Sequence, residues 1–191
     1  MSKNKNLHDN FSLNFILRSF NSVQIGLYFL LGAYLLKSSL QNFIADEDPM
    51  GMMSIEIIEI LQVAIIILVV LFSSLALLFS GKRQARKFQY RLWNKKTKQY
   101  FWIYFIAIIV GILLLNFIVS SGNITFLAPI FLVYYALFLS VLNSTREKTL
   151  YLISGISILL AFLVYIIPTY WYSALLILGA SHIVYGLINR R

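Results

Sequence analysis

The chain lacks cysteine altogether and is poor in charge and in proline: three of its 191 residues are Pro. Without cysteine it can form no disulfide, no thiolate metal site and no cysteine nucleophile. Charged residues make up 12% of the sequence and hydrophobic residues 60%, whereas a soluble domain is roughly 25% charged. This composition argues against a water-soluble globule.

Acidic residues are scarcer than basic ones, with 7 Asp and Glu against 16 Lys and Arg, which leaves a net charge of +9. A basic surplus on so hydrophobic a chain indicates a membrane before it indicates nucleic acid. Half of the cations lie in residues 81–98, between two apolar stretches. Each Lys or Arg close to an anionic leaflet is worth ~1 kcal/mol, so contact with lipid explains this segment and no nucleic-acid partner is expected.

Long stretches without a charged residue predict the membrane crossings. They cover residues 60–81, 99–145 and 149–189. One helix needs ~20 apolar residues to cross the hydrocarbon core, so the first stretch predicts one crossing and the longer two predict two each. The turn-forming residues 120–123 divide the second stretch, and Pro168 divides the third. A further crossing is expected at 22–40, with Lys37 near its end.

We therefore expect an all-α fold, a polytopic transmembrane bundle of six helices. The apolar stretches are continuous and lack the alternation of a transmembrane strand. The expected spans are about 22–40, 58–80, 100–120, 124–143, 149–167 and 170–188, which together make residues 22–191 one transmembrane domain. Residues 1–21 are expected to be a cytoplasmic segment with a short amphipathic interfacial helix, since Leu13, Ile16, Leu17 and Phe20 recur at helical spacing. No cleaved signal peptide is expected.

The distribution of cations predicts the orientation, because short cytoplasmic loops accumulate Lys and Arg. The eight cations of residues 81–98 indicate a cytoplasmic segment. Alternation from there gives an N-in and C-in topology in which every Lys and Arg except Lys37 lies on the cytoplasmic side. The acidic residues Asp46, Glu47 and Asp48 then fall outside, between the first two spans.

Four polar residues within the expected spans form a candidate intramembrane site: Asn116 in the third span, and Ser181, His182 and Tyr185 in the last. An ionisable side chain in hydrocarbon is costly, which makes His182 a candidate for proton relay or ligand binding. The structural alternative is a neutral imidazole hydrogen-bonded to a neighbouring helix. That alternative is favoured because the last four spans contain no acid that could pair with the histidine.

No catalytic, metal-binding or cofactor-binding constellation emerges, and we expect a protein that is not an enzyme. Ser181 and His182 are adjacent, so on a helix they point about 100° apart and cannot act as a nucleophile and its base. The acidic residues 46–48 lack the glycine and the spaced oxygen ligands of a calcium loop. Gly26, Gly32 and Gly179 are instead typical of close helix packing in membranes.

Three stretches together carry a resemblance: residues 82–98, residues 134–152, and Gly179-Ala180-Ser181-His182-Ile183-Val184-Tyr185-Gly186. The chain resembles an uncharacterised family of multi-pass bacterial membrane proteins whose last helix carries a His-Ile-x-Tyr-Gly motif. The resemblance covers about the C-terminal 60% of the chain. It implies a bacterial cytoplasmic membrane and marks His182 and Tyr185 as positions of interest.

The sequence thus predicts an uncharacterised multi-pass membrane protein with a non-enzymatic regulatory or structural role in the bacterial cytoplasmic (inner) membrane. A small-molecule or ion transporter or channel that uses His182, Ser181, Tyr185 and Asn116 is the alternative. The expected partners are the lipid bilayer and a cytoplasmic protein that contacts residues 81–98. Assembly into a homo-oligomer is left open.

Overall fold

The computed structural model describes residues 20–45, 55–87, 92–93, 95–142 and 150–188, which are almost entirely helical. The long helices are α2 (Phe20–Ala45), α3 (Ile55–Lys87), α4 (Lys95–Ser120), α5 (Leu127–Leu142), α6 (Leu150–Ile166) and α7 (Trp171–Ile188). The all-α prediction is confirmed for these residues, and each expected span overlaps one of the six helices. The expected interfacial helix before Phe20 and the acidic residues 46–48 lie outside the described residues.

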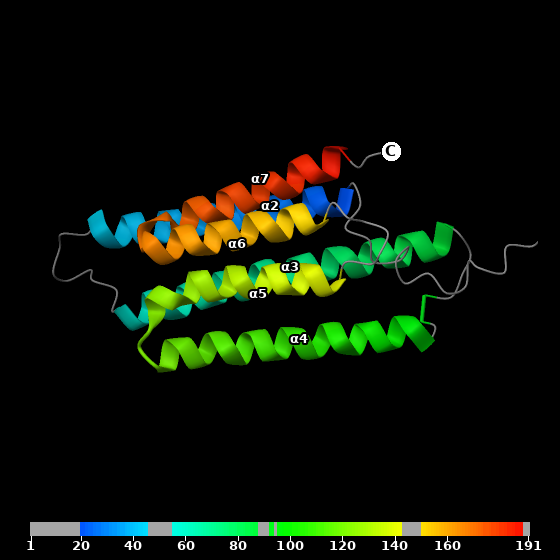
Figure 1. Ribbon diagram of the computed structural model, residues 1–191, viewed down its shortest axis with the longest axis horizontal. Helices are drawn as coiled ribbons and strands as arrows, with labels where there is room; N and C mark the ends of the chain where they lie inside the picture. Colours follow the sequence, from blue (N-terminus) through cyan, green and yellow to red (C-terminus); the bar gives the residue numbers. More distant parts are fainter. Residues whose placement is uncertain (1–19, 46–54, 88–91, 94, 143–149, 189–191) are drawn as a thin grey trace, which may run out of the picture.

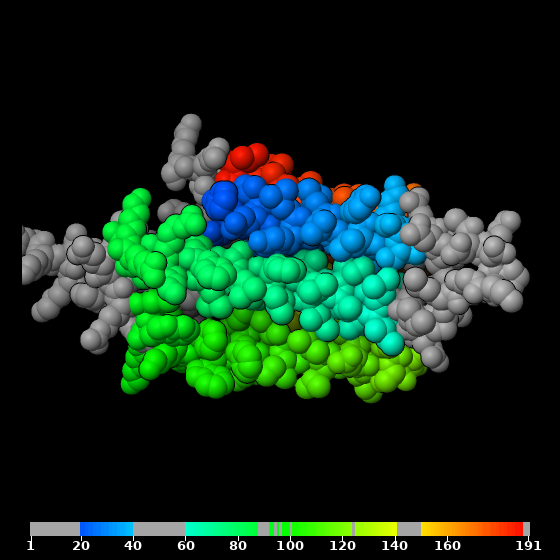
Figure 2. Space-filling view, turned by 180° about the vertical axis from the view of Figure 1, so that it is seen from behind, coloured from blue at the N-terminus to red at the C-terminus, as the bar shows by residue number. Residues whose placement is uncertain are grey.

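The six helices run along a common axis and alternate in direction (Figure 1). α7 packs most extensively on α2, and α6 packs on α5. α2 also contacts α3, whereas α4 lies at one side of the bundle and touches α3 and α5 only sparsely. Figure 2 shows α2, α3 and α4 side by side on the opposite face. The core contains the fully buried side chains of Phe29, Leu36, Leu132, Leu139 and Leu178.

The basic segment 81–98 is more helical than the sequence predicted. α3 continues through Gly81 to Lys87, and α4 already begins at Lys95. Lys, Arg, Gln and Ala are good helix formers, and cations in a final turn interact favourably with the carbonyl end of the helix dipole. The cations of this segment therefore include two exposed groups at helix ends, with Lys82, Arg83, Arg86 and Lys87 on α3 and Lys95 and Lys98 on α4.

Turn chemistry divides the two longest apolar stretches where the sequence indicated. After α4, Gly122 adopts a left-handed φ of 70°. Its amide donates to the Val119 oxygen and the amide of Asn123 donates to the Ile118 oxygen, which is a Schellman cap. A short 3₁₀ turn, η2 (Ile124–Phe126), then leads into α5. Pro168 starts a second turn, η3 (Pro168–Tyr170), between α6 and α7.

Small residues set the closest approach between helices. A Cβ placed on Gly26 of α2 would lie 2.6 Å from the Gly179 oxygen, and one placed on Gly179 of α7 would lie 2.8 Å from the Gly26 oxygen. Both distances are below any real Cβ contact, so the predicted packing role of these two glycines is confirmed. Serines act similarly between α5 and α6, where Ser154 donates to the Ala136 oxygen at 2.9 Å and Ser157 to the Leu132 oxygen at 2.8 Å.

Large apolar side chains cover much of the outer surface, among them Phe117, Leu159 and Ile188, each more than 70% exposed. Soluble proteins rarely expose contiguous apolar surface on this scale. Three stretches are long and apolar enough to cross a membrane: Ile60–Lys87, Thr97–Ser120 and Pro168–Ile188. These features indicate a membrane protein.

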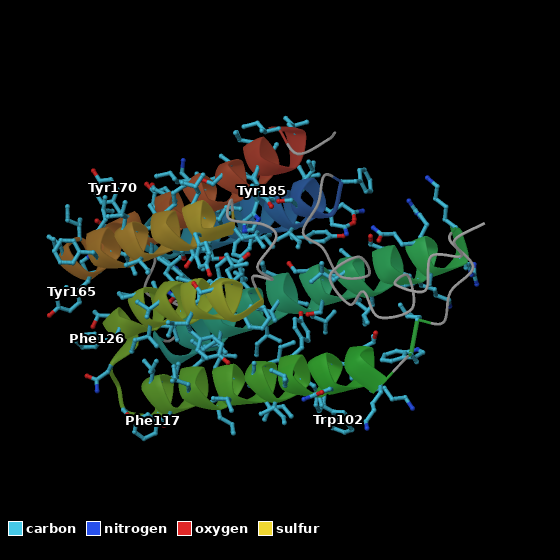
Figure 3. The ribbon with its side chains drawn as sticks, turned by 45° about the vertical axis from the view of Figure 1, so that its right-hand side comes forward. Trp102, Phe117, Phe126, Tyr165, Tyr170 and Tyr185 are labelled. Carbon is cyan, nitrogen blue, oxygen red and sulfur yellow. The ribbon has the colours of Figure 1, made fainter. Side chains whose placement is uncertain are left out.

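Aromatic residues lie near both ends of the bundle, as Trp102 and Tyr170 show (Figure 3). Both of these rings are at least half exposed. Trp171, the next residue in sequence, is buried and meets Phe131 edge to face at 6.5 Å. Lys37 lies 5.8 Å from the ring centre of Tyr172, a cation–π contact between α2 and α7.

Candidate functional site

His182 is completely buried where α2, α5 and α7 meet. Its ring stacks on Phe29 of α2, with 5.8 Å between ring centres and 2° between ring planes. Tyr135 of α5 meets the same ring edge to face, and its hydroxyl lies 2.7 Å from Nε2. Ser22 of α2 lies on the other side, 3.3 Å from Nδ1. Three helices thus converge on one imidazole.

The hydrogen bonds assign the protons of this group. The Ser22 hydroxyl donates to the main-chain oxygen of His182 at 2.8 Å. A serine hydroxyl has a single hydrogen, so the 3.3 Å contact is one in which Nδ1–H donates to the Ser22 oxygen. Nε2 is then the acceptor for the Tyr135 hydroxyl. A neutral imidazole with its proton on Nδ1 satisfies every polar atom of the group, which we call the His182 cluster (Ser22, Tyr135, His182).

The other predicted site residues are only partly brought together. Tyr185 is buried on α7, less than one turn from His182. Ser181 is partly exposed and donates to the Ile177 oxygen of its own helix at 2.8 Å. Asn116 lies on the exposed face of α4, next to Phe117, which points away from the bundle (Figure 3). It therefore does not join the His182 cluster.

An apolar cavity of about 400 Å³ lies between α3, α4 and α5, with Ile25 and Phe29 of α2 at its inner wall. The hydroxyls around it are mostly engaged. Tyr104 of α4 hydrogen-bonds Ser74 of α3, and Tyr134 of α5 donates to the Ala107 oxygen of α4. Phe29 and Tyr135 line the cavity with one side and contact His182 with the other. His182 itself does not line it.

No protein-family model, no curated protein and no solved structure matches the chain. What the site can do must then be inferred from its own atoms. Among the described residues, no group of three or more His, Asp or Glu side chains could hold a metal ion. The His182 cluster is a closed set of hydrogen bonds, and the cavity beside it offers hydrocarbon surface.

Two members of the His182 cluster carry weak sequence signals. Tyr135 lies within one of the stretches that carry the family resemblance, but nothing in its spacing pairs it with His182. Ser22 lies 160 positions from His182 and begins an apolar stretch of ordinary composition. The cavity has no sequence signal, because apolar side chains line it and apolar side chains also face outward.

Proposed function

We propose that this chain is a non-enzymatic multi-pass protein of the bacterial cytoplasmic membrane, with six crossings and a regulatory or structural role. The observation that supports this role is that the His182 cluster satisfies its own hydrogen bonds. Its polar atoms pair with one another across three helices, and His182 has no surface on the cavity. Such a group is better suited to holding helices together than to binding a substrate or passing protons. The bacterial membrane rests on the resemblance of residues 179–186.

Six crossings require that the shorter and less apolar helices also span the bilayer. α5 together with η2 covers 124–142, and at 1.5 Å per residue this reaches about 28 Å, close to the ~30 Å hydrocarbon core. α6 is shorter but is almost wholly apolar. α2 carries Asn21 at its start, where the amide donates to Ser80 of α3 at 2.7 Å, and Lys37 near its other end. Polar groups at helix ends are compatible with crossing.

The proposed orientation is N-in and C-in. The end of α3 and the start of α4, with their exposed cations, lie at the same end of the bundle as the start of α2 and the end of α7 (Figure 1). Cations gathered at one end favour the cytoplasmic side for that end.

We propose that a cytoplasmic protein also contacts this basic end. Asn116, an amide on the exposed face of α4, favours self-association, since polar groups on membrane helices find partners on other helices.

The orientation can be tested cleanly because the chain has no cysteine of its own. We expect single cysteines at Ser121 and Thr169 to react with a membrane-impermeant maleimide in intact spheroplasts. Cysteines at Arg86 and Lys95 should react only after the membrane is permeabilised. All four positions are exposed. The opposite pattern would contradict the orientation, and labelling of Ser121 but not of Thr169 would contradict six crossings.

One observation, the cavity that adjoins Tyr135, supports the alternative of a small transporter or channel. Flux measurements in proteoliposomes distinguish the two functions. We expect no uptake or release of protons, monovalent ions or small organic solutes above that of protein-free vesicles under any imposed gradient. A flux that disappears in Tyr135→Phe but persists in Ser181→Ala would establish the alternative, because Ser181 bonds only within its own helix whereas Tyr135 stands between the cavity and His182.

A further inference from the structure

The cavity between α3, α4 and α5 has the depth of one membrane leaflet. Its lining extends along α3 from Ile66 to Leu78 and along α4 from Phe101 to Leu115. At 1.5 Å per residue, the α3 lining is about 18 Å long, compared with ~15 Å for half of the hydrocarbon core. With almost entirely apolar walls and hydroxyls that are mostly engaged, the cavity suits a hydrocarbon chain.

The cavity approaches the basic end of the bundle. On α4 its lining begins three residues after Lys98, and on α3 it ends four residues before Lys82. At the opposite end it stops more than a helical turn short of Ile60 on α3 and of Ser120 on α4. A chain lying in the cavity would therefore have its polar end near the cations.

Helical periodicity selects two of those cations. Lys82 follows the lining residues Leu75 and Leu78 by seven and four positions, so it lies on the same face of α3. Lys98 precedes the lining residues Phe101 and Phe105 by three and seven positions, so it lies on the corresponding face of α4. Both lysines are exposed.

We propose that the protein holds one anionic phospholipid, with an acyl chain in this cavity and its phosphate at the level of Lys82 and Lys98. The proposal deepens the membrane function above and rests on its placement of the basic end at the inner leaflet. The cavity is apolar, and Lys82 and Lys98 lie beyond its end on the two helix faces that line it. This arrangement matches a ligand with one hydrocarbon end and one anionic end.

The same helices provide a matched control. Arg83 and Lys95 are exposed as well. No residue three, four or seven positions from either of them along its helix lines the cavity, whereas Lys82 and Lys98 each have two such lining residues, so Arg83 and Lys95 do not continue the lining face. Lys82→Gln with Lys98→Gln and Arg83→Gln with Lys95→Gln thus remove equal charge from the same helix ends.

A second variant tests whether the acyl chain of the lipid lies in the cavity. Ser73 lines the cavity, and its buried hydroxyl has no hydrogen-bond partner among the described residues. Ser73→Phe therefore fills the cavity without breaking a hydrogen bond of the described residues. A thermal melt of the detergent-solubilised variant checks that the bundle is still folded.

The test is native mass spectrometry of the full-length protein in mild detergent, titrated with phosphatidylglycerol, with phosphatidylcholine and with glycerol phosphate. We expect one phosphatidylglycerol per chain, weaker binding of phosphatidylcholine and no binding of glycerol phosphate. The Lys82/Lys98 variant should lose about 30-fold in phosphatidylglycerol affinity, since each cation contributes a factor of about 5. Ser73→Phe should lose binding of both lipids, and the Arg83/Lys95 variant should bind as the unmodified protein does.

Equal losses in the two charge variants would overturn the proposal in favour of general attraction to the basic end. Undiminished binding to folded Ser73→Phe would overturn the placement of the chain, and glycerol phosphate binding would assign the site to a free phosphate. Cysteine labelling reports orientation independently of lipid. A reversed orientation with lipid still bound would therefore contradict the proposed function, and a correct orientation without bound lipid would contradict this inference alone.

Discussion

Gly26→Ala and Gly179→Ala each destabilise the protein by about 2–3 kcal/mol, the upper range for overpacking, because either methyl group meets the backbone of the facing helix. The new Cβ would lie 2.6 Å or 2.8 Å from a main-chain oxygen, which unlike a side chain cannot rotate away. α2 and α7, the most extensively packed pair in the bundle, must separate to accept it. Thermal unfolding in detergent measures the loss.

Gly155→Ala is the matched control for these two variants. Gly155 is also in a helix, α6, but a Cβ there has nothing within 4 Å. Because alanine is favoured over glycine in a helix by up to about 1 kcal/mol, this variant should be as stable as the unmodified protein or slightly more so. Equal destabilisation at all three positions would contradict the close approach of α2 and α7.

His182→Ala is expected to cost about 3–5 kcal/mol. It removes a fully buried ring that stacks on Phe29, and it leaves the hydroxyl of Tyr135 without its acceptor. Both the void left by a large side chain and the unpaired buried hydroxyl contribute to this loss of stability. Denaturation by sodium dodecyl sulfate in mixed micelles, followed by tryptophan fluorescence, provides the measurement.

A double-mutant cycle isolates the hydrogen bond within this effect. Tyr135→Phe alone should cost about 1 kcal/mol, and nearly nothing once His182 has been replaced, because the acceptor is then already missing. Ser181→Ala should be neutral, since Ser181 bonds only to its own helix. Strictly additive losses at Tyr135 and His182 would contradict the contact between them.

Helix positions could be predicted from the sequence because long uncharged apolar stretches favour helices of about 20 residues, which turn residues or proline then separate. The expected break at Pro168 and the turn after Ser120 coincide with η3 and the Gly122 cap. α3 ends later and α4 begins earlier than the spans expected from the sequence. The reason is that charged residues limit the apolar span but not the helix. Lysine and arginine continue an α-helix readily once it has left the hydrocarbon.

The neighbours of each helix could not be predicted, for a physical reason. Lipid chains are as apolar as the core, so a membrane helix needs no polar outward face, and periodicity does not separate its packed side from its exposed side. Asn116 and His182 both lie within expected spans, yet Asn116 is exposed and His182 is enclosed. Only three-dimensional packing brings Ser22 and Tyr135 to His182.

Phe29 and Tyr135 form a wall that the cavity and the His182 cluster share. The Tyr135 ring cannot be displaced on its cavity side without moving the hydroxyl that binds Nε2 on the other. Linkage is reciprocal: an occupant that favours one position of the ring stabilises the hydrogen bond of that position, and a variant that breaks the bond changes the affinity for the occupant by the same free energy. A single aromatic side chain thus connects the cavity to the seam that joins α2, α5 and α7.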